Sequence, residues 1–236
     1  MSVAIVTGAG RGIGRAVSVR LARRGWAVVG VARTEADLTE TGRLCAEAAG
    51  EAMGEVFVPL AASVTEEATA TQAVESASKL GLLRAVVYCA GLAPAKSVEE
   101  TSAELFREVL ETNLTGAFLL ARASWGAMRE HGGGSVVLVS SMAARDPFPG
   151  FVAYGPAKAA VNLLAMVLDR EGKSQGIRAY AVAPGAVETA MLRQLVTKEQ
   201  WPTEKTLDPD DVAAVIEACV EGELRHSGGE TIYLQK

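Results

Sequence analysis

Short runs of apolar, mostly β-branched residues alternate along the chain with longer segments of helical periodicity. The short runs predict strands, and the longer segments predict helices. The predicted strands are Val3–Thr7, Ala27–Ala32, Glu55–Leu60, Arg84–Cys89, Ser135–Ser140, Arg178–Val182 and Thr231–Leu234. Two helices are clearly predicted, Gly12–Gly25 after the first strand and Pro209–Val220 before the last.

Several of the predicted strands are apolar on both faces. The runs Ala27–Ala32 and Ser135–Ser140 lack the alternation of a half-exposed strand, which is typical of parallel strands covered by helices on each side. The sequence contains no linker, repeat or block of charge. We therefore expect residues 1–236 to form a single α/β domain, a doubly wound parallel sheet of about seven strands with helices on both faces.

One segment, residues 188–208, loses the helical periodicity and contains Pro202. An irregular segment of this length inside a compact domain is often functional, so we interpret it as a candidate substrate loop. Its apolar side chains are expected to form a lid over bound substrate; they are Met191, Leu192, Leu195, Val196 and Trp201. The alternative is a loop packed permanently on the core or at a subunit contact.

Charge and cysteine content narrow the classes of function. The 23 basic and 28 acidic side chains give a net charge of −5, which argues against nucleic acid as a partner. The three cysteines, Cys45, Cys89 and Cys219, lack CxxC spacing and predict free thiols of a cytoplasmic protein with no metal site. No run of about 18 apolar residues predicts a membrane span.

A glycine-rich turn separates the first strand from the first helix. It contains Gly8, Gly12 and Gly14 in GxxxGxG spacing, which differs from a strict GxGxxG. A turn of this kind lets backbone N–H groups approach a pyrophosphate, and the helix N-terminus favours the anion. The alternative is a tight turn without a ligand.

Tyr154 and Lys158 lie four residues apart and face the same way if their segment is helical. Pro156 is compatible with the first turn of a helix, so this helix is predicted to begin close to Tyr154. An ammonium group nearby lowers the pKa of a phenol, which makes the phenol useful for acid–base chemistry. Ser140 and Ser141 end a predicted strand, where ligands bind in open α/β sheets. The alternative for the Tyr–Lys pair alone is a solvated helix surface.

Together these motifs resemble the classical short-chain dehydrogenase/reductase family, and the resemblance covers essentially the whole chain. The glycine turn is similar to the family's TGxxxGxG, and Tyr154 with Lys158 to its YxxxK. Counting back thirteen residues from Tyr154, the family's usual spacing, selects Ser141 rather than Ser140. Asn113, in a predicted long helix, matches the fourth catalytic residue, which holds a water of the proton relay.

The resemblance also implies a Rossmann fold and a set of cofactor contacts. Pro184, Gly185, Val187 and Thr189 match the PGxxxT segment beside the nicotinamide. The implied cofactor-binding residues are Gly8, Arg11, Gly12, Ile13, Gly14, Arg33, Ala90, Gly91, Tyr154, Lys158, Pro184, Gly185, Val187 and Thr189.

The chain departs from the family pattern at two places. The usual Asn-Asn-Ala-Gly after the fourth strand is Tyr88-Cys89-Ala90-Gly91, so only its last two residues carry over. We interpret Cys89 as core packing rather than as a nucleophile. Ser63 stands where an acidic residue commonly contacts adenine, which leaves the adenine contacts open.

The end of the second strand bears on the choice of cofactor. NAD enzymes of this fold place an acid there, whereas this chain has Ala32 followed by Arg33. Thr34, Glu35 and Asp37 fit a helix capping box better than a ribose site. Because Arg33 and Arg11 are able to bind a 2′-phosphate, we expect NADP(H) as the cofactor.

These expectations combine into an NADP(H)-dependent oxidoreductase that transfers a hydride between nicotinamide and a carbonyl or secondary alcohol. Tyr154 is the expected general acid, Lys158 lowers its pKa, Ser141 orients the carbonyl and Asn113 completes the relay. The substrate is expected to be a small carbonyl compound or an acyl thioester, because the pattern is closest to 3-oxoacyl-carrier-protein reductases. The resemblance implies a homotetramer or homodimer.

Two other functions are considered. A catalytically silent NADP-binding regulator would use the same fold, although the full set of four catalytic residues argues against it. A nucleotide-sugar epimerase or dehydratase shares YxxxK, but such enzymes normally carry a further substrate domain, for which 236 residues leave little room.

Overall fold

One parallel sheet organises the molecule. The computed structural model describes residues 1–50 and 56–236 and contains seven paired strands in the order β3-β2-β1-β4-β5-β6-β7. Every pairing is parallel. The strands are β1 (Ser2–Thr7), β2 (Ala27–Ala32), β3 (Phe57–Ala61), β4 (Leu82–Tyr88), β5 (Gly134–Val139), β6 (Ile177–Pro184) and β7 (Thr231–Leu234). The prediction of a doubly wound, Rossmann-like parallel sheet is confirmed.

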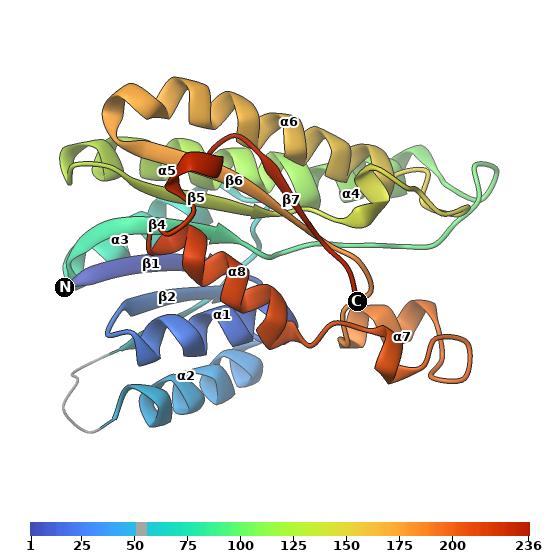
Figure 1. Cartoon of the computed structure of the whole chain (residues 1–236), viewed down its shortest axis with the longest axis horizontal. Coiled ribbons are helices and arrows are strands. Elements are labelled where there is room, and N and C mark those ends of the chain that lie inside the picture. Colours follow the sequence, from blue (N-terminus) through green and yellow to red (C-terminus); the bar gives the residue numbers. More distant parts are fainter. Residues whose placement is uncertain (51–55) are drawn as a thin grey trace.

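Helices cover both faces of the sheet, as Figure 1 shows. The α-helices are α1 (Gly12–Arg23), α2 (Glu35–Ala49), α3 (Glu67–Leu80), α4 (Ala103–Leu110), α5 (Gly116–Glu130), α6 (Tyr154–Gly172), α7 (Ala190–Leu195) and α8 (Pro209–Val220). Helices α1, α2 and α8 pack on one face, and α3, α5 and α6 pack on the other. Among the described residues, no helix is both long and apolar enough to cross a membrane.

The central strands are buried on both faces, as the apolar runs predicted. In β1, Ala4 and Val6 belong to the core layer under α1 and α8, whereas Val3 and Ile5 belong to the layer under α3, α5 and α6. All four side chains are inaccessible to solvent. Parallel strands between two helical layers have this property because neither face meets water.

The predicted strands agree with the observed ones to within two residues at the described ends, and Glu55 lies outside the described residues. Helix α8 has the predicted bounds, but α1 ends at Arg23 rather than Gly25, which has a φ of +83°. The predicted capping box at Thr34 is wrong. Thr34 precedes α2, but its hydroxyl is exposed and makes no capping hydrogen bond.

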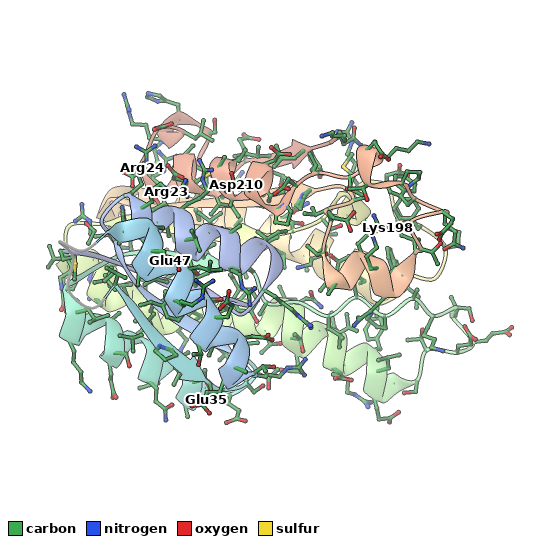
Figure 2. All side chains as sticks on the ribbon, turned by 90° about the horizontal axis from the view of Figure 1, so that it is seen from below. Arg23, Arg24, Glu35, Glu47, Lys198 and Asp210 are labelled. Atoms are coloured by element: carbon green, nitrogen blue, oxygen red, sulfur yellow. The ribbon has the colours of Figure 1, made fainter. Side chains whose placement is uncertain are left out.

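The prediction of an irregular segment at 188–208 also needs correction. It contains helix α7 and a short 3₁₀ turn at Thr203–Lys205. Val187 and Leu207 form an isolated parallel bridge where the segment leaves and rejoins the core. Lys198, which belongs to this segment, is labelled in Figure 2.

An ion-pair cluster joins α1 to α8. The Glu217 carboxylate is almost fully buried and accepts hydrogen bonds from Arg20 Nε at 2.5 Å and Arg24 Nε at 2.6 Å. Arg20 Nη1 also contacts Asp210 Oδ2 at 2.8 Å. Arg24 and Asp210 are labelled in Figure 2 on the exposed side of this pair of helices. The cluster joins α1 to α8 at two places, near the start of α8 at Asp210 and near its end at Glu217.

Candidate active site

The candidate site lies at the carboxyl ends of the central strands. The sheet order reverses between β1 and β4, and ligands of open α/β folds bind at such a switch point. The glycine turn follows β1, Ala90 and Gly91 follow β4, and Ser141 follows β5. The fold therefore brings all three motifs to one edge of the sheet.

The glycine turn is shaped by close backbone contacts. A Cβ on Gly14 would lie 2.3 Å from the Gly8 carbonyl oxygen, and one on Gly8 would lie 2.9 Å from the Ala90 nitrogen. Gly8 and Gly12 have φ values of +64° and +56°, a region that favours glycine. All three glycines are thus required by the backbone itself.

The turn also has the properties of an anion site. It leads into α1, which has no acidic residue in its first turn, and Arg11 occupies the N-cap with an exposed side chain. Orphan N–H groups and the helix dipole favour a phosphate there. Thr7 Oγ1 accepts a hydrogen bond from the Ala90 nitrogen at 3.2 Å, a role of Thr7 that the sequence motif did not indicate. The residues present fit the pyrophosphate of a dinucleotide.

The two serines after β5 have different surroundings. Ser140 is buried, and its Oγ donates to the Lys158 carbonyl oxygen at 3.0 Å. Ser141 is half-buried, its Oγ accepts from the Ala143 nitrogen at 3.1 Å, and its side chain is close enough to the Tyr154 phenol to lower the pKa of that group. Ser141 is therefore the serine beside the phenol, whereas Ser140 supports the helix that carries Lys158.

Tyr154 begins α6, as Pro156 predicted. Burial raises the pKa of Tyr154, and the nearby Ser141 side chain only partly offsets this rise. We expected Lys158 to lower the pKa of Tyr154, but the overall change in this pKa is a rise. The reason is that Lys158 Nζ donates to the Val139 carbonyl oxygen at 2.8 Å and lies 5.6 Å from the Tyr154 ring centroid, without a direct bond to the phenol.

Lys158 itself is 3% exposed. Burial lowers the pKa of Lys158 to about 8, because a desolvated ammonium is less stable than a solvated one. At neutral pH the group still carries its charge for most of the time. A positive charge this close to a phenol stabilises the phenolate when a proton leaves.

Asn113 lies in a π-helical turn, Glu111–Thr115, rather than in the continuous α-helix that was expected. Its side chain is fully buried, and Nδ2 donates to the carbonyl oxygens of Leu92 at 2.8 Å and Val109 at 2.9 Å. A Cβ on Gly91 would lie 2.9 Å from Asn113 Oδ1 and 3.6 Å from Lys158 Nζ. Gly91 thus marks the place where Asn113 and Lys158 approach each other.

The segment after β6 reaches the glycine turn. Pro184 ends β6, Gly185 donates to the Leu234 carbonyl oxygen at 2.9 Å, and Val187 is buried. A Cβ on Gly12 would lie 3.2 Å from the Thr189 methyl group, so Thr189 lies against the turn. Thr189 Oγ1 accepts from the Leu192 nitrogen at 3.3 Å and caps α7, a contact that the PGxxxT motif did not predict.

An ion pair holds the α7 segment together. The Glu188 carboxylate pairs with the Arg193 guanidinium, which lowers the pKa of Glu188 to about 2. Arg193 Nη1 also donates to the carbonyl oxygens of Thr197 and Trp201 at 3.2 and 2.9 Å. In this segment Met191 and Trp201 are each 38% exposed. The apolar side chains of the candidate lid are thus carried by an ordered segment.

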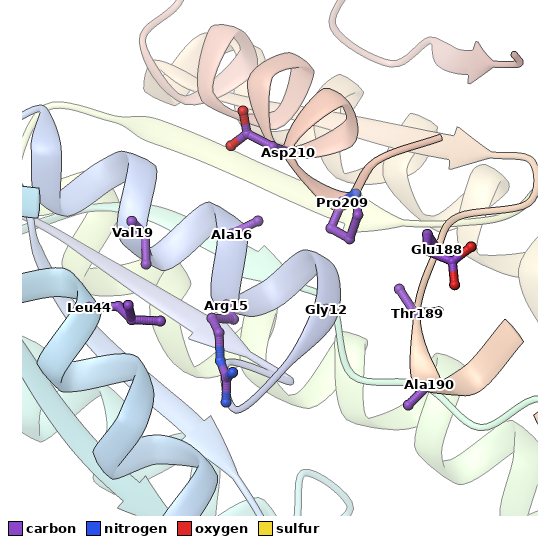
Figure 3. Close-up of a pocket in the computed structure, with 10 residues that line it drawn as sticks. All are labelled: Gly12, Arg15, Ala16, Val19, Leu44, Glu188, Thr189, Ala190, Pro209 and Asp210. Atoms are coloured by element: carbon purple, nitrogen blue, oxygen red, sulfur yellow. The ribbon is translucent and has the colours of Figure 1, made fainter. Parts of the chain in front are cut away.

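An open hollow of about 420 Å³ adjoins the glycine turn on its α1 side, as Figure 3 shows. It lies between α1, the start of α8 and the beginning of the α7 segment, and its lining residues are Gly12, Arg15, Ala16, Val19, Leu44, Glu188, Thr189, Ala190, Pro209 and Asp210. Tyr154 and Lys158 do not line it. It therefore borders the candidate cofactor site but is separate from the Tyr–Lys–Ser cluster.

The residues expected at the adenosine end are also close to the turn. Ile13 lies in the first turn of α1, and Arg33 follows β2 directly with an exposed side chain. Ser63 Oγ is engaged with Thr65 Oγ1 at 2.8 Å, within the turn before α3. Cys89 is half-buried against the core, and burial raises its thiol pKa to about 12, which does not suit a nucleophile.

Comparison with known proteins agrees with this geometry. A reductase-like relative, the chloroplastic NADPH-dependent aldehyde reductase-like protein of Arabidopsis thaliana, is 30% identical over 98% of this chain and 89% of its own. The 3-oxoacyl-[acyl-carrier-protein] reductase FabG of Escherichia coli is 29% identical over 98% of this chain and 95% of its own. A short-chain type dehydrogenase/reductase from Mycobacterium ulcerans has the same fold, with a TM-score of 0.90 at 24% identity over 99% and 88% of the two chains. Because the short chain dehydrogenase family pattern matches residues 2–200, most of its length, this protein belongs to that family.

Proposed function

We propose that this protein is an NADP(H)-dependent oxidoreductase that transfers a hydride between the nicotinamide and a carbonyl or secondary-alcohol substrate. The observation that carries the proposal is the meeting of Tyr154, Ser141 and Lys158 at the same sheet edge as the glycine turn. Membership of an oxidoreductase family supports the class of reaction. A bound nicotinamide supplies the hydride, and the protein supplies positioning and electrostatics.

The proposed roles follow from the contacts of each side chain. Tyr154 donates a proton to the carbonyl oxygen, and its raised pKa keeps it protonated before reaction. The Lys158 ammonium stabilises the phenolate that forms, from 5.6 Å away. Ser141, which lies beside the phenol, orients the substrate oxygen. Asn113, beside Lys158 at Gly91, holds the far end of the proton relay.

We propose that the pyrophosphate lies on the glycine turn and that Arg11 and Arg33 bind the 2′-phosphate of NADP(H). Both guanidinium groups are exposed and adjoin the turn or the end of β2, and neither donates a hydrogen bond within the described residues. The NADPH-dependent relative named above supports this cofactor. Val187 and Thr189 would then lie on the nicotinamide side, next to Gly12.

A spectrophotometric panel tests the proposal. NADPH oxidation is followed at fixed enzyme concentration with β-ketoacyl thioesters, quinones, ketosteroids, sugars and small diketones. Turnover of at least one carbonyl class that is lost in Tyr154→Phe supports the proposal. The FabG relative makes β-ketoacyl thioesters the first class to test, as the substrate of a 3-oxoacyl-carrier-protein reductase. Tight NADPH binding without any turnover would favour the silent regulator.

The lowered pKa of Lys158 predicts a pH dependence. Below about pH 8 the ammonium is present, and above it the charge is lost, so kcat/KM for carbonyl reduction should fall as pH rises through about 8. The pKa of Tyr154 lies above its ordinary value, so the phenol should lose its proton at a higher pH than Lys158 does. The measurement is a kcat/KM profile from pH 6 to 10.

Lys158→Arg serves as the control, because a guanidinium keeps its charge across this range. Its activity is expected to be lower, but the fall near pH 8 should disappear. If the variant retained the same falling limb, a group other than Lys158 would be responsible.

We propose a homo-oligomer, a dimer or tetramer, in which α5 and α6 form the contact. These two helices pack on the same face of the sheet and expose large apolar side chains, namely Phe118, Leu163, Met166 and Val167 at 36–60% exposure. Leu163→Glu combined with Met166→Glu should dissociate the assembly, as measured by sedimentation velocity at micromolar concentration. Val98→Glu, at a 73% exposed apolar position elsewhere, is the control. Sedimentation of the unmodified protein as a monomer would refute this proposal.

A further inference from the structure

The π-helical turn that carries Asn113 is held from outside by a tyrosine. In this turn, Glu111–Thr115, which joins α4 to α5, the Gly116 nitrogen bonds the Glu111 carbonyl oxygen. The Thr112 carbonyl oxygen accepts a hydrogen bond of 2.7 Å from the hydroxyl of Tyr88. Tyr88 is the last residue of β4 and is 1% exposed. A strand end is thus tied to the residue that immediately precedes Asn113.

Gly116 gives the Tyr88 hydroxyl its space. A Cβ on Gly116 would lie 2.3 Å from Tyr88 Oη and 2.7 Å from the Val64 carbonyl oxygen. A larger residue at 116 would therefore push the hydroxyl away from Thr112. Burial raises the pKa of Tyr88, so the phenol stays protonated and able to donate at every ordinary pH.

We propose that Tyr88 is a positioning residue that holds Asn113 in register with Lys158, an inference that rests on the proposed proton relay. The Asn113 amide is fixed by Leu92 and Val109, and its Oδ1 lies beside Gly91 together with Lys158 Nζ. If the π-helical turn relaxed, the Asn113 side chain would move relative to the ammonium. Displacements of about 1 Å in a catalytic arrangement cost up to about 100-fold in rate.

Tyr88→Phe removes only the hydroxyl, and Tyr180→Phe is a matched control. Tyr180 is equally buried, but its hydroxyl has no hydrogen-bond partner within the described residues. Tyr88→Phe is expected to lower kcat about 10- to 100-fold and to leave KM for NADPH within about twofold. Tyr180→Phe should change neither. A kcat of Tyr88→Phe within about twofold of the unmodified enzyme would overturn the proposal.

A double substitution separates positioning from general damage to the fold. In an Asn113→Ala background, Tyr88→Phe should lower kcat by less than about twofold further, because its effect runs through Asn113. An equal loss in both backgrounds would show that Tyr88 acts by another route. If Tyr88→Phe yields little folded protein, Tyr88→Met, which also removes the hydroxyl and fills the space with a flexible apolar side chain, is measured in the same two backgrounds.

Hydrogen–deuterium exchange gives a readout independent of turnover. Amides of residues 111–116 should exchange at least about tenfold faster in Tyr88→Phe than in Tyr180→Phe, with the sheet unchanged. Unchanged exchange in this segment would overturn the positioning role. If the unmodified protein reduced no carbonyl, the proposed function would fail, and the exchange data would still decide whether Tyr88 holds the turn.

Discussion

Tyr154→Phe is expected to lower kcat for carbonyl reduction by about 100- to 10,000-fold, the usual contribution of general acid–base catalysis. The substitution removes the proton donor and keeps the ring. NADPH affinity, measured by the change in nucleotide fluorescence, should stay within about twofold, because the glycine turn and the two arginines do not contact the phenol hydroxyl. The loss should therefore appear in kcat and not in cofactor binding.

Two comparisons make this result specific. Tyr180→Phe removes a phenol hydroxyl that has no partner among the described residues, so it reports the cost of a buried Tyr→Phe change alone. Ser141→Ala should lower kcat as well, because the Ser141 hydroxyl lies beside the Tyr154 phenol and is proposed to orient the substrate oxygen. If Tyr154→Phe kept more than about a tenth of the kcat of the unmodified enzyme, Tyr154 would not be the general acid.

The fold was predictable because burial on both faces leaves a direct trace in the sequence. Strands such as Ala27–Ala32 carry no polar or charged side chain at any position, and Gly25 and Arg33 flank this run in the sequence. Short-range signals were less reliable. Thr34 precedes a helix and has an acidic residue at the right spacing, yet its hydroxyl makes no capping bond. A capping-box sequence therefore shows which hydrogen bonds are possible at a helix start, but it does not show which of them form.

The candidate site was predictable where one motif carries both partners, as Tyr154 and Lys158 do on one helix. It was not predictable where the partners are distant in sequence. The hydrogen bonds from Ala90 to Thr7 and from Tyr88 to Thr112 span 83 and 24 residues. These contacts depend on how strand ends and helices meet, which no local spacing encodes. The sequence indicated the Tyr88 contact only indirectly, because Tyr88 replaces the first asparagine of the family's usual Asn-Asn-Ala-Gly.

The direction of the Tyr154 pKa shift likewise could not be predicted from the YxxxK motif. A lysine four residues away suggests a lowered pKa, but the structure directs Lys158 Nζ to the Val139 carbonyl oxygen and partly desolvates the half-buried phenol. The balance between desolvation and charge depends on depth of burial, which sequence spacing does not determine. The catalytic effect of Lys158 is therefore expected on the phenolate formed during reaction rather than on the resting phenol.

A strong preference for NADPH over NADH is the other large effect that we expect. The 2′-phosphate brings about two negative charges to a place where Ala32 offers no opposing carboxylate and where Arg33 and Arg11 are exposed. Asp37, close to Gly10, is accompanied by Arg15, whose Nη2 donates to the Asp37 carbonyl oxygen at 3.3 Å. The balance of charge at this end of the site thus favours the phosphate.

Arg33→Ala should lower kcat/KM for NADPH by about 10- to 150-fold, because one hydrogen bond to a charged group contributes about 1.5–3 kcal/mol. The kcat/KM for NADH should change little, since NADH lacks the 2′-phosphate that Arg33 is proposed to bind. Ala32→Asp should shift the preference towards NADH, because the new carboxylate accepts the ribose hydroxyls and repels the phosphate. Steady-state kinetics with both cofactors at low ionic strength measure these effects.

Arg23→Ala provides the control for a general loss of positive charge. Arg23 is exposed in the last turn of α1, at the opposite end of that helix from the glycine turn, so its removal should change neither cofactor by more than about twofold at moderate ionic strength. Added salt should weaken NADPH more than NADH in the unmodified enzyme, because screening acts on the phosphate contacts. Equal use of the two cofactors at low ionic strength, or equal weakening of both by Arg33→Ala, would reduce Arg33 to a surface cation.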